Sequence, residues 1–156
     1  MTTRRTHQSG MLLIEAMVAV LIFALGILGL VAMGGAAVNA QSDAQYRTEA
    51  ANLADAIAGE IQLAATRNGV GEVVPTSLDA FKYLESGSDC AFTGTTPAAN
   101  ARVNALVTSS PLPGATNVTQ QIAVETANAN RVKITLCWQS RNDSAMRQHV
   151  LVTYVN

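Results

Sequence analysis

The sequence predicts an α+β fold, in which one long N-terminal helix carries a small antiparallel β-sheet of three or four strands on its outer half. Three observations support this prediction: an uncharged apolar run near the N-terminus, an amphipathic stretch directly after it, and alternating apolar segments near the C-terminus. With 156 residues, the chain has room for a membrane anchor and one modest head domain.

The apolar run covers residues 16–38 and contains no charged side chain over 23 positions. As a helix it would be about 34 Å long, enough to cross a hydrocarbon core of about 30 Å. Arg4 and Arg5 lie in residues 1–10, which contain no acidic residue. The positive-inside rule therefore predicts a single-pass anchor with a cytoplasmic N-terminus and an extracytoplasmic head.

A secretory signal peptide is the alternative interpretation of this region, because it also combines positive charge with an apolar core. Small residues within 32–40 would loosely supply its cleavage site. Glu15 argues against it, since a carboxylate at the centre of a span costs about 2.5 to 3.5 kcal/mol and usually marks a functional site. A second alternative places Glu15 at the membrane interface, where its side chain reaches water.

Residues 8–33, QSGMLLIEAMVAVLIFALGILGLVAM, resemble the N-terminus of type IV prepilins and of type II secretion pseudopilins. The shared pattern is a short basic leader, a glycine, a hydrophobic first mature residue and a glutamate at the fifth mature position. The resemblance implies that a prepilin peptidase cuts after Gly10 and methylates the new amino terminus at Met11. It also implies that Glu15 is the glutamate of the family.

Departures from the family pattern are small. Met11 stands where phenylalanine is usual, and Leu12 stands where threonine is usual. The proline common in the transmembrane part of major pilins is absent, and Gly34 and Gly35 lie close to that place. Glycine is a poor helix former, by about 1 kcal/mol relative to alanine, so these two residues offer local flexibility instead.

A carboxylate at position 15 has a physical use once the leader is removed. The chain then begins with a cationic amine on Met11, and Glu15 can pair with that amine on its own helix or on a neighbouring one. Because an unpaired carboxylate is costly in a medium of low dielectric, this pairing favours one axial position of an incoming subunit. We expect Glu15 to set the register of assembly.

An amphipathic stripe follows the apolar run and is formed by Tyr46, Ala50, Leu53, Ile57 and Ile61. Their spacings of three and four place them on one helical face. We expect one helix from Met11 to about Arg67, ended by the Asn68-Gly69 pair. The expected organisation is a cleaved leader at 1–10, a transmembrane and assembly half at 11–38, and a periplasmic head at 39–156.

The rest of the head is expected to form short helices and a sheet. Residues 69–120 are rich in small and polar side chains, with short helix candidates near 78–84 and 102–107 and a turn at Leu112-Pro113-Gly114. Alternating apolar residues predict strands at 121–126, 131–138 and 147–155. An antiparallel sheet packed on the helix is the economical arrangement, with Trp138 in the core.

Cys90 and Cys137 are the two cysteines of the chain. In an extracytoplasmic head we expect them to form a disulfide, which would strap the irregular region across the outer side of the sheet, because Cys137 and Trp138 alternate between its faces. Two buried thiols are the alternative. Their spacing fits no zinc motif.

Features within and beyond the anchor resemble one family of prepilin-like proteins in particular. The LGILGL segment, a short helix, the LPG turn and a strand ending in tryptophan resemble the minor pilin family of type IV pilus modification proteins, PilV. This implies a structural subunit that helps to start or cap pilus assembly. The implied partners are prepilin peptidase, other minor pilins, the major pilin through helix packing, and the bacterial inner membrane before incorporation into the pilus. A type II secretion pseudopilin is the alternative.

Other classes of function have little support in the sequence. No nucleophile, base and orienting group stand at a recognisable spacing, and no phosphate-binding loop is present, so we expect no enzyme activity, catalytic residue, cofactor or metal. Without Arg4 and Arg5, eight of the ten Lys and Arg residues remain against 11 Asp and Glu. Nucleic acid is therefore not an expected partner, which disfavours a DNA-uptake pilin.

Overall fold

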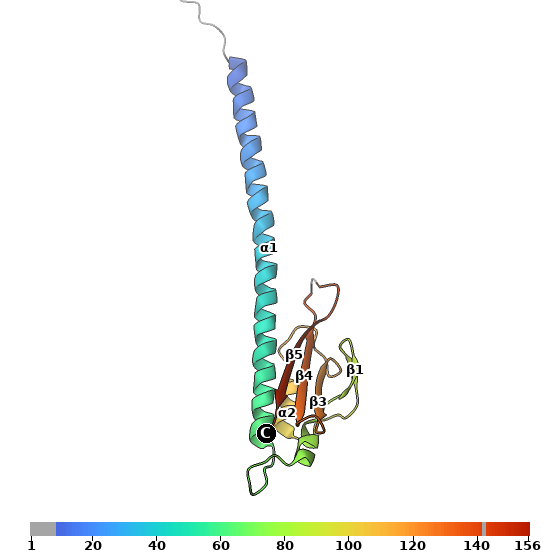
Figure 1. Ribbon diagram of the computed structural model, residues 1–156. Coiled ribbons are helices and arrows are strands. Elements are labelled where there is room, and N and C mark those ends of the chain that lie inside the picture. The colour runs from blue at the N-terminus through green and yellow to red at the C-terminus, as the bar shows by residue number, and fades with distance from the viewer. Residues whose placement is uncertain (1–8, 142) are drawn as a thin grey trace, which may run out of the picture. The chain divides into compact units, whose positions relative to one another are not determined.

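The computed structural model describes residues 9–141 and 143–156, with side chains from Met11 onward, and has the expected α+β fold (Figure 1). A long N-terminal helix is followed by a three-stranded antiparallel sheet and a separate two-stranded sheet. The chain forms two compact units, one ending at Ser42 and one running from Asp43 to Asn156. Most of the expected leader, residues 1–8, lies outside the described residues.

The helix α1 spans Ser9–Ala64. Its 56 residues correspond to about 84 Å. It ends three residues before the expected Arg67, because the chain turns there into a loop closed by its own backbone: the Val74 N–H donates to the Thr66 carbonyl at 2.8 Å, and the Asn68 N–H donates to the Glu72 carbonyl at 2.8 Å. These bonds satisfy backbone groups that a longer helix would have used.

The main sheet has the strand order β3-β4-β5 and is antiparallel throughout. Strand β4, Arg131–Trp138, has the predicted bounds, whereas β3 spans Gln120–Glu125 and β5 spans Arg147–Tyr154, each one residue away from the prediction at one or both ends. Strand β3 stops before Thr126 because the carbonyl of that residue accepts the Asn130 N–H in the following turn, at 3.4 Å.

The connecting region contains the two expected short helices and one hairpin that was not predicted. The 3₁₀ helix η1 spans Pro75–Phe81 and α2 spans Ala101–Thr108. Between them, β1 (Ser86–Ser88) and β2 (Ala91–Thr93) pair as a two-stranded sheet. Each strand is only three residues long, and Phe92 is the one large apolar side chain in the pair, so the alternation that predicted the long strands is absent.

The expected turn at 112–114 is present, and its glycine is required there. Gly114 has φ of +67°, and the Ala115 N–H donates to the Leu112 carbonyl at 3.2 Å. A Cβ on Gly114 would lie 3.0 Å from the Gln139 carbonyl oxygen, so a side chain would be both strained and crowded.

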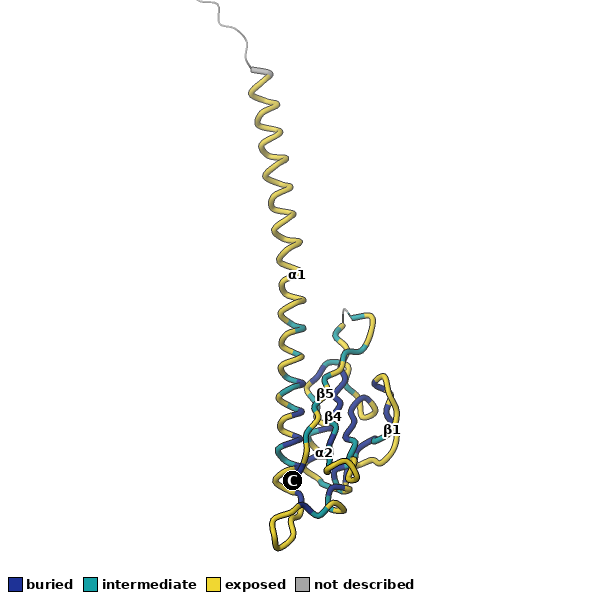
Figure 2. The backbone as a smooth tube through the Cα atoms, in the orientation of Figure 1, coloured by how far each residue is buried: buried dark blue, intermediate teal, exposed yellow. Residues whose placement is uncertain are grey.

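The core lies between the second part of α1 and the main sheet (Figure 2). From the predicted helical stripe, Ala50, Ile57 and Ile61 are fully buried, and Tyr46 and Leu53 pack partly buried against the same core. The sheet contributes Ile122, Val132, Ile134, Leu136 and Trp138, all almost without exposure. The prediction that Trp138 belongs to the core is confirmed.

Candidate membrane and assembly segment

The first part of α1 is exposed on every side. Every residue from Met11 to Gln41 is exposed, in contrast to the one-sided burial farther along the helix (Figure 2). Seventeen large hydrophobic side chains between Met11 and Val38 are each 45–80% exposed. A helix that is apolar all round is typical of a membrane span or of the interior of a helical bundle. By length and composition, α1 is able to cross a membrane.

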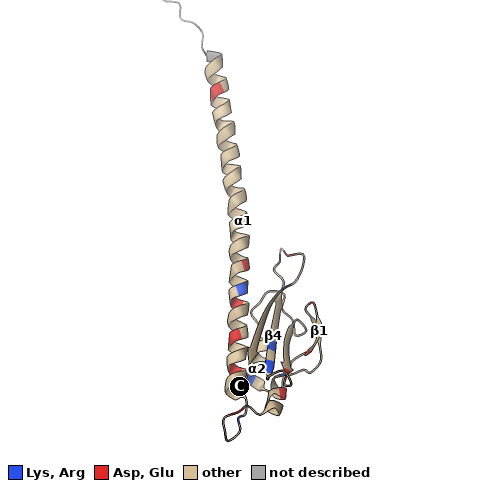
Figure 3. Cartoon of the chain, viewed as in Figure 1, with Lys and Arg blue, Asp and Glu red and all other residues tan. Residues whose placement is uncertain are grey.

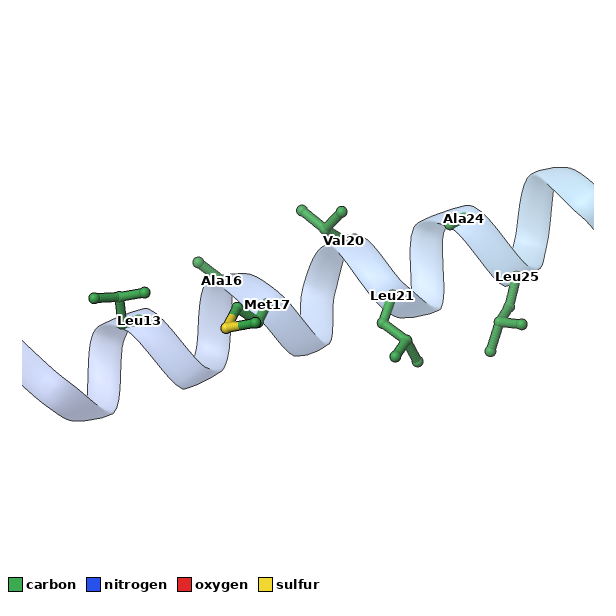
Figure 4. Close-up of a pocket in the computed structure, with 7 residues that line it drawn as sticks. All are labelled: Leu13, Ala16, Met17, Val20, Leu21, Ala24 and Leu25. Carbon is green, nitrogen blue, oxygen red and sulfur yellow. The ribbon is translucent and has the colours of Figure 1, made fainter.

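One surface of this segment is hollowed, as Figure 4 shows in close-up. The hollow lies between Leu13, Ala16, Met17, Val20, Leu21, Ala24 and Leu25 and has no polar lining. Because all seven residues belong to one helix, it is an open groove along the helix surface and not an enclosed cavity. Its shape and chemistry suit contact with another apolar side chain or with a lipid tail.

Glu15 is the only charged residue between Met11 and Ser42. Figure 3 shows the long stretch without charge that separates it from the charged second part of α1. Glu15 lies four positions after Met11 in a continuous helix, so the two residues lie on the same face, one turn apart. A new amino terminus at Met11 would therefore lie within reach of this carboxylate. Gly10, the residue before the expected cut, lies in the first turn of α1.

Four glycines in the exposed part of α1 have no packing reason within this chain. A Cβ added at Gly26, Gly29, Gly34 or Gly35 would meet nothing within 4 Å. Each glycine costs the helix about 1 kcal/mol relative to alanine. No described contact within the chain compensates for this loss of helix stability. Close contact with another molecule or bending of the helix therefore explains the four glycines best.

An ion-pair cluster joins α1 to the sheet where the second compact unit begins. Arg147, at the start of β5, contacts the Asp43 carboxylate at 2.6 Å and donates from Nε to the Asp143 carboxylate at 2.8 Å. The hydrogen bond from Arg147 holds the pKa of Asp143 below its ordinary value, and the same bond raises the pKa of Arg147. The sequence did not predict this cluster, because Asp43 and Arg147 are too far apart in the chain for a spacing rule.

Cys90 and Cys137 form the expected disulfide. Both residues are buried, and Cys137 lies on the sheet face opposite to Trp138, as alternation along β4 predicts. Hydrogen bonds hold the same region: the Gln121 amide donates to the Leu84 carbonyl at 3.1 Å, and Tyr83 forms a bridge with Ile122. The disulfide thus straps the segment around the β1-β2 hairpin onto the outer sheet face.

No group of three or more His, Cys, Asp or Glu side chains within the described residues is placed to hold a metal ion. Comparisons with protein families, with curated proteins and with solved structures find no match for this chain. The exposed apolar segment and Glu15 are therefore the features of the chain that bear most directly on its function.

Proposed function

We propose that this chain is a minor pilin, a structural subunit without enzyme activity that takes part in type IV pilus assembly. The observation that carries the proposal is Glu15, the one charge in an otherwise apolar and fully exposed helical segment, five residues after Gly10. A simple membrane anchor has no use for a carboxylate at that depth. A subunit that must dock at one axial position, next to an N-terminal amine, has such a use.

The exposed apolar surface needs two successive environments in this proposal. Burying seventeen large hydrophobic side chains at about 1.5 kcal/mol each is worth about 25 kcal/mol, so the segment is not stable in water. Before assembly, lipid of the inner membrane covers it. In the filament, the helices of other minor pilins and of the major pilin replace the lipid, and the glycines of α1 permit close approach.

The second part of α1 supports the same proposal, because it is the spine of the head. Ala50, Ile57 and Ile61 bury one face of it in the core, and the Asp43–Arg147 pair joins its first turn to the sheet. A displacement of the helix therefore moves the whole head. The Cys90–Cys137 disulfide suits a head in the oxidising periplasm.

Mass spectrometry of the mature N-terminus tests the processing step. We expect a chain that begins at methylated Met11 when prepilin peptidase is present, and an accumulated precursor when Gly10 is replaced by valine. A mature chain that begins within residues 32–41 would show a secretory signal peptide and would overturn the proposal.

Replacement of Glu15 by alanine tests the assembly step. The variant is expected to be processed normally but to enter the filament fraction at least several-fold less than the native chain, because no carboxylate pairs with the neighbouring amine. Asp55→Ala is a matched control, since Asp55 is an exposed carboxylate on the head part of the same helix. Equal incorporation of the Glu15 variant and this control would contradict the role in register.

Crosslinking in the membrane separates the pilus from its alternative. Pilus subunits are the expected crosslinked neighbours of the apolar segment. Neighbours that belong to a type II secretion machine would assign the chain to a pseudopilus with the same assembly chemistry.

A further inference from the structure

Strand β5 forms a free edge of the main sheet. The Val155 N–H donates to the Asn130 carbonyl at 3.2 Å, which fixes the alternation of the antiparallel ladder. The odd-numbered residues of β5 therefore bond to β4, and the backbone groups of the even-numbered ones point outward. No other segment of the described chain bonds to these outward groups. At the opposite edge, Tyr83 exchanges two hydrogen bonds with Ile122 and covers part of β3.

The outward residues of this free edge lack the side chains that usually prevent pairing with another strand. Its four outward residues are Gln148, Val150, Val152 and Tyr154, which include no charged side chain and no proline. Val150 and Val152 are each 41% exposed, and Tyr154 is 51% exposed. Natural edge strands usually carry lysine, proline or a bulge that prevents another strand from adding. Three of the four outward residues are thus exposed valine or tyrosine side chains, which suits strand addition.

One end of the edge carries an arginine that forms no ion pair with another described residue. A hollow of about 310 Å³ lies between α1 and the start of β5, lined by Arg47, Trp138, Arg147, Gln148 and His149. Arg147 is paired with Asp43 and Asp143. Arg47 is exposed and makes no ion pair within the part of the chain that the structure describes. The hollow thus offers a free guanidinium beside the first outward residue of the edge.

We propose that this edge binds an extended segment of another polypeptide as an additional antiparallel strand. Apolar side chains at alternate positions of that segment cover Val150, Val152 and Tyr154, and a carboxylate at its carboxyl end pairs with Arg47. The direction follows from the charge: β5 runs from Arg147 to Tyr154, so an antiparallel strand ends beside Arg47. Backbone hydrogen bonds supply the affinity, and the alternate side chains supply the specificity.

A second copy of this chain is not the occupant. Asp43 contacts Arg147 and Gln62 contacts Thr153, so α1 and β5 run in the same direction within the head. Antiparallel pairing of two β5 strands would reverse one of the two helices. The helices of two copies anchored in one membrane run in the same direction, which excludes this pairing. The exclusion of a second copy therefore rests on the membrane anchor of the function proposed above, whereas the binding of a separate segment does not depend on that function.

Peptide binding to the full-length chain in detergent micelles tests the proposal. The probe is a fluorescein-labelled heptapeptide, TVTVTVE, with a free carboxyl end, and its comparison is TVTVTVQ with an amidated end. We expect fluorescence anisotropy to give a dissociation constant on the order of 100 µM for the acidic peptide. The neutral peptide should bind at least about threefold more weakly, and Arg47→Gln should remove this difference.

Two variants of the edge show where the peptide binds. Val152→Pro removes one outward N–H that takes no part in the β4 ladder, and Val152→Lys adds a charge to the same edge. Each is expected to weaken binding at least about tenfold while the fluorescence of Trp138 shows an intact head. Val118→Lys is the matched control, because Val118 is 55% exposed outside the edge, and it should leave binding unchanged.

Three results would overturn the inference. The first is binding that survives both Val152 variants, and the second is no binding of the acidic peptide at millimolar concentration. The third is a disulfide between two Val152→Cys chains, which would make a second copy the occupant. Since no filament forms in micelles, failure here leaves the processing and assembly tests of the proposed function unaffected.

Discussion

Replacement of both Cys90 and Cys137 by alanine is expected to lower the free energy of unfolding of the head by about 4 kcal/mol. The two residues are separated by 47 positions. In the chain-entropy model, a loop of this length removes about 14 cal/mol/K from the unfolded state, which is about 4 kcal/mol at 25 °C. This is a large part of the 5 to 15 kcal/mol that is typical of a whole domain.

The contacts around the disulfide explain why we expect a weakened head and not a collapsed one. Without the bond, the Gln121 amide still donates to the Leu84 carbonyl, and Tyr83 still bridges Ile122. The strapped segment therefore keeps its place on the outer sheet face. The loss then comes mainly from the greater freedom of the unfolded chain, with a smaller part from the two buried sulfur atoms.

Urea unfolding followed by tryptophan fluorescence measures this effect. Trp138 is the single tryptophan, is 1% exposed and neighbours Cys137, so its emission shifts to the red when the head opens. With a urea slope of about 2 kcal/mol per molar, the midpoint should fall by about 2 M. Native protein treated with a reducing agent should show a similar fall. A shift below about 0.5 M in the double variant would refute the entropic reasoning.

Three further changes test other parts of the chain. Asn100→Ala should lower the free energy of unfolding by about 1 kcal/mol, because the Asn100 side chain caps α2, whereas Asn100→Asp should retain most of the stability. The hydrogen bond from Arg147 lowers the pKa of Asp143, so the Asp143 carboxylate stabilises the head above about pH 4 and loses this effect as the pH falls through its lowered pKa. Asp143→Asn should therefore make the urea midpoint less sensitive to acid. An unchanged dependence of the midpoint on pH would contradict this. Gly29→Ala should leave the head stable but reduce incorporation into filaments by crowding a helix contact, and equal incorporation with the control Gly59→Ala would count against that contact.

Much of the fold follows from patterns that a single sequence contains. The stripe from Tyr46 to Ile61 predicted a helix and the face that it buries, and strict alternation along residues 131–138 predicted β4 at its observed bounds. Each pattern belongs to a helix or strand with one buried face, so the spacing of its apolar residues directly shows which side chains lie on that face. The Cys90–Cys137 bond followed from the small number of cysteines and the expected compartment.

Other features depend on contacts that no local pattern reports. The end of α1 at Ala64 is decided by bonds across residues 66–74, and the β1-β2 hairpin has no apolar alternation. For the candidate site, the sequence indicated Gly10, Met11 and Glu15, because their spacing along one helix is itself the signal. The free edge of β5 was not predicted, since a strand's place in the sheet depends on which strands pair.

The Asp43–Arg147 pair lies at the boundary between two parts of α1 that differ in exposure. From Met11 to Gln41 the helix is exposed on all sides, and farther along one face is covered by the head. At this boundary the helix has little apolar contact with the sheet, because the first fully buried residue of the stripe is Ala50. A charged contact of 2.6 Å to β5 at Asp43 therefore joins helix and sheet one to two turns earlier than core packing does. Asp43→Asn should therefore loosen the start of the head part of α1, seen as faster amide exchange at residues 43–49, while the core around Ile57 and Ile61 stays protected.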